Sequence, residues 1–419
     1  MTTPRPIVVL KLLPYPLHAG TIGIVRWAGR RGHDVVVVGE RAGTPVAQSR
    51  YLTARVPLPA RTTPEALARW LVDVVPAGQP PLLVPVDDLG SAFVQENAET
   101  LSSAYWFHRL EPTLPRRLID KGTMAQLAVE AEVPVPRHWD PQTEAKLEQV
   151  LREVPLPLVV KMRDPDRAAH TPGVAGVQIV RDSQHCRDAW TSHLVDGRPN
   201  CILQEYVPGN PDSVWMINAY ADADSRLTFA STGRKIRQWP PYTGATSLGI
   251  CQRNDTVVAL TQKFVSATGY RGILDVGWRY DARDGTYKLL DFNPRIGATF
   301  RLFVGERGTD VLEALAIDAR GATCPPDESR DGRRWLNDAY DTVTAGIYAR
   351  DGRLSPTDFV RSRQGVDERV WRARDDMRPY AVMLRIAGRA IASHAVERGT
   401  DGMRRRGQDT RNASRHDRP

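Results

Sequence analysis

The residues best suited to chemistry in this chain are two aspartates, Asp275 and Asp291, in adjacent runs of β-branched and aromatic residues. These runs, residues 272–280 and 288–295, are separated by residues 281–285, whose sequence Asp-Ala-Arg-Asp-Gly is typical of a turn, so a β-hairpin is predicted. If the five-residue turn is symmetric about its middle residue, Asp275 stands directly opposite Asp291. Like charges with Cβ atoms about 5 Å apart destabilise a sheet unless a cation lies between them or one stays protonated.

Two further polar residues share the face of Asp291, because side chains alternate along a strand. Asn293 adds a neutral oxygen, and the guanidinium of Arg295 suits a phosphoryl oxygen. Such a cluster favours Mg²⁺, which takes its remaining ligands from water and phosphate. A solvated hairpin is the alternative, and a two-residue turn at 284–285 would move Asp275 off Asp291.

The sequence Asp-Phe-Asn-Pro-Arg at 291–295, behind an acidic strand residue, resembles the metal and phosphate signature of ATP-grasp enzymes. Members commonly carry Glu at the metal positions, whereas this chain has Asp at both. The resemblance covers about residues 1–320. It implies an α/β fold: an N-terminal Rossmann-like preATP-grasp domain, then an ATP-grasp domain with a lid subdomain and an antiparallel-sheet core. It also implies ATP and two Mg²⁺ ions, for which Mn²⁺ can substitute, and the metal ligands Asp275, Asp291 and Asn293.

Upstream lysines match the phosphate contacts of this family. Lys161 ends an apolar strand at 157–161, and the loop after it contains Gly173, so this hairpin is expected to fold over a triphosphate. Lys121, in an Asp-Lys pair at a helix, matches a lysine that often lies near the phosphates. A surface lysine is the alternative for Lys121.

The apolar strand at 201–205 breaks into a Pro-Gly turn, which leaves backbone groups free to read an adenine edge. The resemblance makes this segment the hinge between lid and core. Gln204, Glu205 and Val207 then fall on adenine positions and Asp212 near the ribose position. A plain edge strand and turn is the alternative.

Residues 228–244 concentrate Arg234, Lys235 and Arg237 after a strand, in a chain in which only seven of 57 basic residues are lysine. Such a cluster is costly unless an anion joins it. The resemblance implies that this basic loop faces the transferred phosphoryl group or an acidic substrate, which makes Lys235, Arg237 and Arg295 the catalytic candidates. A nucleic-acid patch is the alternative, but further basic and aromatic interleaving is missing, so no nucleic-acid partner is expected.

The N-terminal part predicts a parallel α/β unit, with strands at 7–12, 34–39 and 81–86 and a helix ending at Arg31. Gly20 and Gly23 do not complete a dinucleotide fingerprint, so helix packing is the preferred interpretation. Asp87 and Asp88, after the third strand, either cap the next helix or lie where ligands bind. We count both, with Arg301, as weak candidates for substrate contact.

With 419 residues, 41% hydrophobic and 25% charged, the chain is expected to be a soluble globular protein of two or three units. The expected domains are 1–115, 116–325 with a lid at about 134–205, and a C-terminal helical extension at 326–419. Four cysteines without paired spacing, and the lack of a signal peptide or an 18-residue apolar run, predict a reduced cytoplasmic protein.

The C-terminal extension carries most of the positive charge. Of the net charge of +8, +7 lies in residues 349–419, which include a helical pattern at 380–396 and a basic tail expected to be disordered from about 400. One interpretation is a helix packed on the body with a solvated tail, which is slightly preferred. The other is weak contact with an anionic membrane surface.

These features favour an ATP-dependent ligase that joins a carboxylate to an amine through an acyl phosphate, with release of ADP and phosphate. The expected substrates are a small carboxylate, amino acid or peptide-like, and an amine. No Walker A pattern, nucleophile elbow or zinc signature competes with this interpretation. The alternatives are a carboxylase-like or kinase-like member of the family, and a nucleotide-sensing binding protein without turnover.

Overall fold

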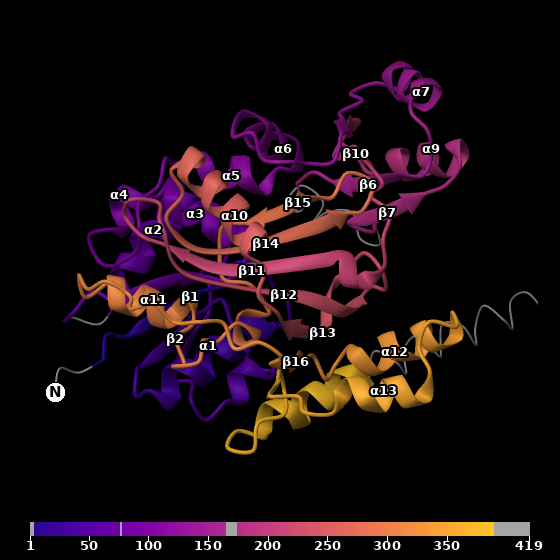
Figure 1. Cartoon of the computed structure of the whole chain (residues 1–419). Coiled ribbons are helices and arrows are strands. Elements are labelled where there is room, and N and C mark those ends of the chain that lie inside the picture. Colours follow the sequence, from indigo (N-terminus) through magenta and orange to yellow (C-terminus); the bar gives the residue numbers. More distant parts are fainter. Residues whose placement is uncertain (1–3, 76–77, 165–173, 389–419) are drawn as a thin grey trace, which may run out of the picture.

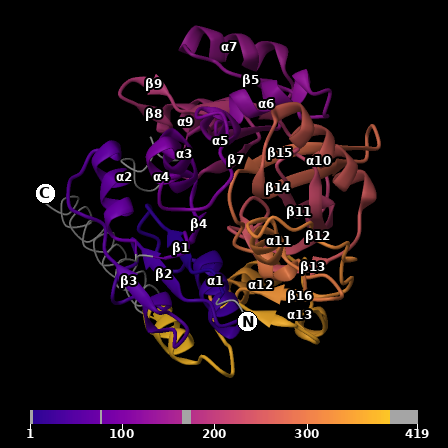
Figure 2. The same ribbon diagram turned by 90° about the vertical axis from the view of Figure 1, so that its left-hand side faces the viewer.

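The computed structural model describes residues 4–75, 78–164 and 174–388. Three sheets of four or more strands carry the fold, and helices pack on them (Figures 1 and 2). In the part of the chain that is described, no helix is long and apolar enough to cross a membrane.

A parallel sheet of four strands, in the order β3-β2-β1-β4, forms the N-terminal unit. Its central strand β1 is fully buried, as expected for an apolar run covered on both faces. The predicted parallel α/β arrangement is therefore confirmed, although the short β3 was missed. The elements are β1 (Ile7–Leu10), α1 (Ala19–Arg30), β2 (Val35–Val38), β3 (Ala54–Val56), α2 (Pro64–Asp73), β4 (Leu82–Pro85), α3 (Asp88–Glu96) and α4 (Ala98–Leu101).

Helix α1 begins at Ala19, so Gly20 and Gly23 lie inside the helix. A Cβ atom on Gly23 would lie 2.7 Å from a ring carbon of Phe300, closer than real contacts allow. The helix-packing interpretation is confirmed for Gly23, because only glycine lets the two segments approach so closely.

The second sheet, in the order β5-β10-β6-β7, is antiparallel and stands apart at the upper right of Figure 1. Its own apolar cluster includes Leu147, Val160 and Trp190. Two short helices, divided at Asp120, precede it where one was expected; Asp120 caps the second by accepting from the amides of Gly122 and Thr123. The elements are α5 (Leu114–Ile119), α6 (Lys121–Glu130), β5 (His138–Trp139), α7 (Glu144–Glu153), β6 (Leu158–Met162), β7 (Val177–Val180), α9 (Ser183–Ser192), β8 (Leu194–Val195), β9 (Arg198–Pro199) and β10 (Cys201–Glu205).

The third sheet has seven strands, in the order β15-β14-β11-β12-β13-β16-β17, and side-chain alternation gives it two buried faces. Trp215 and Ile217 of β11 pack in the cluster that contains Phe264 of α10, while Met216 and Tyr220 belong to the cluster that includes α1 and α11. The elements are β11 (Val214–Ala221), β12 (Leu227–Trp239), β13 (Ala245–Cys251), α10 (Asp255–Thr268), β14 (Gly272–Asp281), β15 (Thr286–Asn293) and α11 (Val311–Asp318).

The C-terminal segment is not only helical, as had been expected. β16 (Arg334–Leu336) and β17 (Glu368–Arg369) extend the third sheet, and α12 (Asp341–Arg350) and α13 (Pro356–Arg363) lie between them. Strands of two or three residues are too short for an alternating pattern to reveal. A helix is present from residue 378 to 388; the rest of the predicted helix, with Arg389, and the basic tail lie outside the described residues.

Candidate active site

A cavity of about 530 Å³ lies where four parts of the chain meet. They are the second sheet (β5-β10-β6-β7), which we call the lid sheet, the seven-stranded sheet, the start of α1 and the C-terminal segment. This volume is typical of a small-molecule site. Predicted residues in its wall are Lys161, Gln204, Glu205, Val207, Lys235, Asp275, Asp291, Asn293 and Arg295.

The predicted hairpin is present as β14 and β15, but its predicted register is wrong. Asp275 pairs with Asn293, and Asp291 lies opposite Gly277. The turn has four residues, 282–285, which moves the pairing by one position. A bulge at Leu290 moves it by one more, because Trp278 pairs with Leu289 and Gly277 with Asp291.

The new register leaves the polar cluster on one face, with Asn293 between the two carboxylates. The Asn293 amide nitrogen lies 3.5 Å from Asp275 Oδ2 and 3.4 Å from Asp291 Oδ2. Its Oδ1 accepts from Arg295 Nη2 at 3.2 Å. The amide nitrogen also donates to the backbone carbonyl of Asp275 at 3.0 Å, so the amide oxygen would turn toward the carboxylates only with a cation between them.

The two carboxylates differ in their electrostatic surroundings. Burial alone would raise the pKa of Asp291, but Lys121, Lys161 and Arg295 hold it at about 2. Burial raises the pKa of Asp275, which Arg295 offsets only in part. Lys121 forms an ion pair with Asp291, which brings it to the site although it does not line the cavity.

Lys161 and Lys235 are cations that face the cavity from different sheets. Lys161 Nζ donates to the carbonyl of Leu290 at 2.6 Å, and Lys235 Nζ donates to the carbonyl of Gly244 at 3.1 Å. Burial lowers the pKa of Lys161 to about 8 and also lowers that of Lys235. Lys235 lies within β12 rather than in the expected basic loop.

Arg295 and Asp88 form a pair at the edge of the cavity, with Nε 2.6 Å from Asp88 Oδ1. Burial would lower the pKa of Arg295, but Asp88 and Asp275 outweigh it and raise the pKa. Asp88 therefore orients Arg295. Asp87 caps α3 and accepts from the amides of Leu12, Leu13 and Gly90, so its contacts are structural.

The hinge residues Gln204, Glu205 and Val207 line the cavity at the end of β10. Burial would raise the pKa of Glu205, but the bonds that it accepts from the Arg137 backbone amide and, at 2.7 Å, from Arg283 lower it. The segment after Glu205 stays irregular until Pro211, and the carbonyls of Gly209 and Asn210 accept from Arg279 and Ser213, so the stretch at 206–208 is the part that could serve a ligand.

Three predicted site residues lie elsewhere. Arg237 is buried in a two-bond pair with Asp341, at 2.8 and 2.9 Å, because two bulges in β12 change the direction of its side chain. Arg301 pairs with Asp310, and Asp212 lies in a separate pocket, 3.8 Å from Arg234. We therefore give none of the three a role in the cavity. Gly173 lies outside the described residues.

Sequence reasoning missed His18, Trp335, Asn337 and Tyr340, which also line the cavity. His18 caps α1 by accepting from the Thr21 amide, and burial, with Arg295 and Lys11 nearby, lowers its pKa to about 3. Its position just before a helix was a signal for a cap. Nothing in the sequence marks the other three, which belong to the C-terminal segment.

Mg²⁺ and ATP fit this donor set. Two carboxylates and an amide oxygen suit a hard cation that completes its shell with water and phosphate. Within the described ranges, no three His, Cys, Asp or Glu side chains gather into a metal cage, so an ion here needs ligands from a bound phosphate. The lysines and Arg295 supply positive charge for that phosphate.

Comparison with known proteins gives a consistent fold. No family profile matches the chain. D-aspartate ligase from Enterococcus faecium is 22% identical over 249 residues, which cover 57% of this chain and 58% of that enzyme, so the match spans less than two thirds of the curated relative.

Two solved structures are similar over most of the chain. L-amino acid ligase from Bacillus licheniformis has a TM-score of 0.57 at 17% identity, over 80% of this chain and 79% of that one. The biotin carboxylase domain of Hydrogenobacter thermophilus 2-oxoglutarate carboxylase, solved with MgADP and bicarbonate, has a TM-score of 0.56 at 12% identity, over 80% and 74%. Similarity at this level establishes the shared fold.

Proposed function

We propose that this chain, which has the ATP-grasp fold, is an ATP-dependent ligase that joins a carboxylate to an amine and releases ADP and phosphate. One observation carries the proposal. A single cavity brings two acidic strand residues, Asp275 and Asp291, together with the cationic groups of Lys161, Lys235 and Arg295.

The nucleotide is held between the lid and the core. Gln204, Glu205 and Val207 offer the hinge backbone to the adenine, and Lys161 reaches the phosphates from the lid strand. Lys121 adds a second cation at Asp291. These positions leave the terminal phosphate near β14 and β15.

Asp275, Asp291 and Asn293 would hold Mg²⁺. The ion, when bound, neutralises charge on the β and γ phosphates. Asn218 supports this arrangement, because it is fully buried and donates to Asp275 Oδ1 at 2.8 Å. That bond fixes one oxygen of the carboxylate and leaves Oδ2 toward the cavity.

The carboxylate oxygen of the substrate attacks the γ-phosphorus, which forms an acyl phosphate and releases ADP. The amine then attacks the acyl carbon, loses a proton and expels inorganic phosphate. Lys235 and Arg295 stabilise charge on the transferred group. No protein nucleophile is needed, in agreement with the four cysteine thiols, which are buried and whose pKa values are raised by burial.

The activities of two similar proteins support an amino acid as one substrate. One is a D-aspartate ligase and another an L-amino acid ligase. The biotin carboxylase domain was solved with bicarbonate, which makes bicarbonate the competing carboxylate to test.

The test is ADP and phosphate release with MgATP and the amino acids, in both enantiomers, singly and in pairs, with bicarbonate as a separate arm. Mass spectrometry identifies the condensed product, and hydroxylamine traps an acyl phosphate as a hydroxamate. Product formation with ADP release supports the ligase. Release of AMP and pyrophosphate, or ADP release that requires bicarbonate and forms no amide, contradicts it.

A further inference from the structure

Two buried amide side chains line one end of the cavity. Gln238 is 3% exposed, and its buried Nε2 has no hydrogen-bond partner. Asn337 is 5% exposed and lies at the end of β16. Both line the cavity. β13 lies between the two residues, because Gln238 pairs with Thr246 and the backbone N–H of Asn337 donates to the carbonyl of Ser247. Their backbones are therefore two strand spacings, roughly 10 Å, apart.

The orientation of the Asn337 side chain is fixed by its partners. The indole Nε1 of Trp371 donates to Asn337 Oδ1 at 3.2 Å, and the Ala339 amide donates to the same oxygen at 3.1 Å. Neither partner can accept a hydrogen bond, so the atom that faces them must be the oxygen. The Nδ2 group is left toward the cavity.

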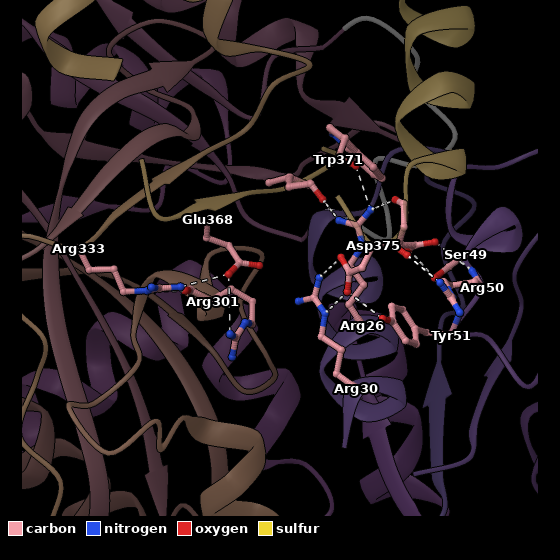
Figure 3. A network of polar contacts seen from close by, with 12 residues as sticks. Arg26, Arg30, Ser49, Arg50, Tyr51, Arg301, Arg333, Glu368, Trp371 and Asp375 are labelled. Atoms are coloured by element: carbon pink, nitrogen blue, oxygen red, sulfur yellow. Dashed lines mark hydrogen bonds and ion pairs between the residues drawn. The ribbon is translucent and has the colours of Figure 1, made fainter. Parts of the chain in front are cut away.

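Trp371 is in turn anchored on α1. Its carbonyl accepts from Arg26 Nη2 at 2.9 Å (Figure 3). Arg26 Nε pairs with Asp376 at 3.0 Å. Asp376 also accepts from Ser49 Oγ at 2.7 Å and the Arg50 amide at 3.0 Å. Trp371 and Arg26 are nearly fully buried. A chain of buried contacts thus runs from α1, whose first residue lines the cavity, to Asn337.

We propose that Asn337 binds the carboxylate of an amino acid or peptide substrate, and that Trp371 is the positioning residue that presents the side-chain amide of Asn337 to it. The inference rests on the proposed function. It means that the C-terminal segment, residues 334–376, forms the substrate-binding part of the proposed active site.

The residues around this end of the cavity favour a ligand group that accepts hydrogen bonds. Lys235 adds a cation close to Gln238 on the same strand, and the carboxylates that line the cavity, Glu205, Asp275 and Asp291, come from β10, β14 and β15. Tyr340 stacks on Trp239 with ring centroids 6.1 Å apart and gives this end an aromatic side. Amide donors beside a cation and a flat apolar wall suit a carboxylate attached to an apolar or aromatic body.

The experiment compares Asn337→Leu, Asn337→Asp and Trp371→Phe with the wild type. Trp278→Phe is the matched control, because Trp278 is equally buried and its indole N–H has no partner. Binding of the individual amino acids is measured by calorimetry with MgADP present, and turnover is measured separately. Thermal unfolding checks that each variant is folded.

Asn337→Leu is expected to weaken binding of the recognised amino acid by about 10-fold, as for a hydrogen bond to a charged group. Asn337→Asp should weaken it further by placing two negative charges together. Trp371→Phe should have a smaller effect on substrate KM, with kcat and the KM for ATP unchanged. Trp278→Phe should change none of these constants.

The two proposals fail separately. If an amino acid binds to the wild type and the Asn337 variants weaken it, but nothing is turned over, the ligase assignment is wrong and the binding pocket stands. If the Asn337 variants bind it as tightly as the wild type, or no amino acid binds to the wild type, the pocket is wrong. An equal effect of Trp371→Phe and Trp278→Phe would remove the positioning role.

Discussion

Buried cations have different hydrogen-bond partners in two regions of this molecule: carboxylates in one and backbone carbonyls in the other. At the contact between α1 and the C-terminal segment, Arg26 pairs with Asp376, and earlier in that segment Asp341 accepts two bonds from Arg237 of β12. In the cavity, Lys161 and Lys235 have only carbonyl oxygens as hydrogen-bond partners among the described residues. Burial lowers the pKa of both lysines.

The difference separates cations that hold the fold from cations that serve a ligand. A buried charge with a carboxylate partner is already compensated, and losing that partner is costly to stability. A buried lysine whose only hydrogen-bond partner is a carbonyl oxygen keeps most of the free-energy cost of desolvation. An anion that binds next to the lysine offsets this cost. The comparison predicts that variants of the first kind change unfolding and variants of the second kind change binding.

The largest effect is expected from Asp291→Asn in the cavity. It removes the negative charge from the metal site, so kcat/KM should fall by more than about 100-fold in a protein that stays folded, although the loss of the carboxylate partner of Lys121 should lower its melting temperature. Asp275→Asn should act in the same direction but less completely. A double Asn variant with wild-type turnover would rule out the metal site.

At the α1 contact, Asp376→Asn should destabilise the protein by about 3–5 kcal/mol, because Arg26 stays buried without its counter-charge. Urea unfolding measures this change. Calorimetry of the folded variant should give an unchanged Kd for MgATP. If stability were unchanged and ATP binding were weakened, this ion pair would serve a ligand rather than the fold, contrary to the comparison.

Lys161→Ala should weaken ATP binding by about 10-fold, since it removes one charged contact with phosphate. Stability should change little, because the desolvation of the lysine is offset only in part by its attraction to Asp291. Amino acid binding in the presence of MgADP should change less than ATP binding. Equal losses for both ligands would argue against a phosphate contact.

The smallest effect is expected from removing residues 400–419, which should leave ATP turnover nearly unchanged. Sedimentation with anionic vesicles then separates the two interpretations of the basic tail. Salt-sensitive binding that the truncation weakens supports membrane contact. Failure of the full-length protein to bind at low salt excludes it.

The sequence predicted those parts of the fold that depend on local patterns, such as strands and the hairpin between two neighbouring strands. Apolar runs such as those of β1 and β10 indicated their strands directly. The antiparallel hairpin followed from two such runs and a turn. Its register did not, because composition marks where a turn lies but neither its four-residue length nor the bulge at Leu290.

The candidate site was predicted in part for the same reason. Residues on strands that face the cavity, such as Lys161 and Asn293, followed from strand phase. Arg237 did not, because bulges in β12 break that phase. Asn337 reaches the cavity only through tertiary packing of a three-residue strand, which no local pattern records.

The bulge in β15 also links the lid to the core mechanically. Leu290 is left without a partner in the ladder of β14, and its carbonyl accepts from Lys161 of the lid strand β6. This hydrogen bond ties the lid strand β6 to β15, the strand that carries Asp291 and Asn293. If Lys161 contacts phosphate as proposed, the phosphate and the Leu290 carbonyl would share the same lysine, and the lid would need little additional ordering on binding.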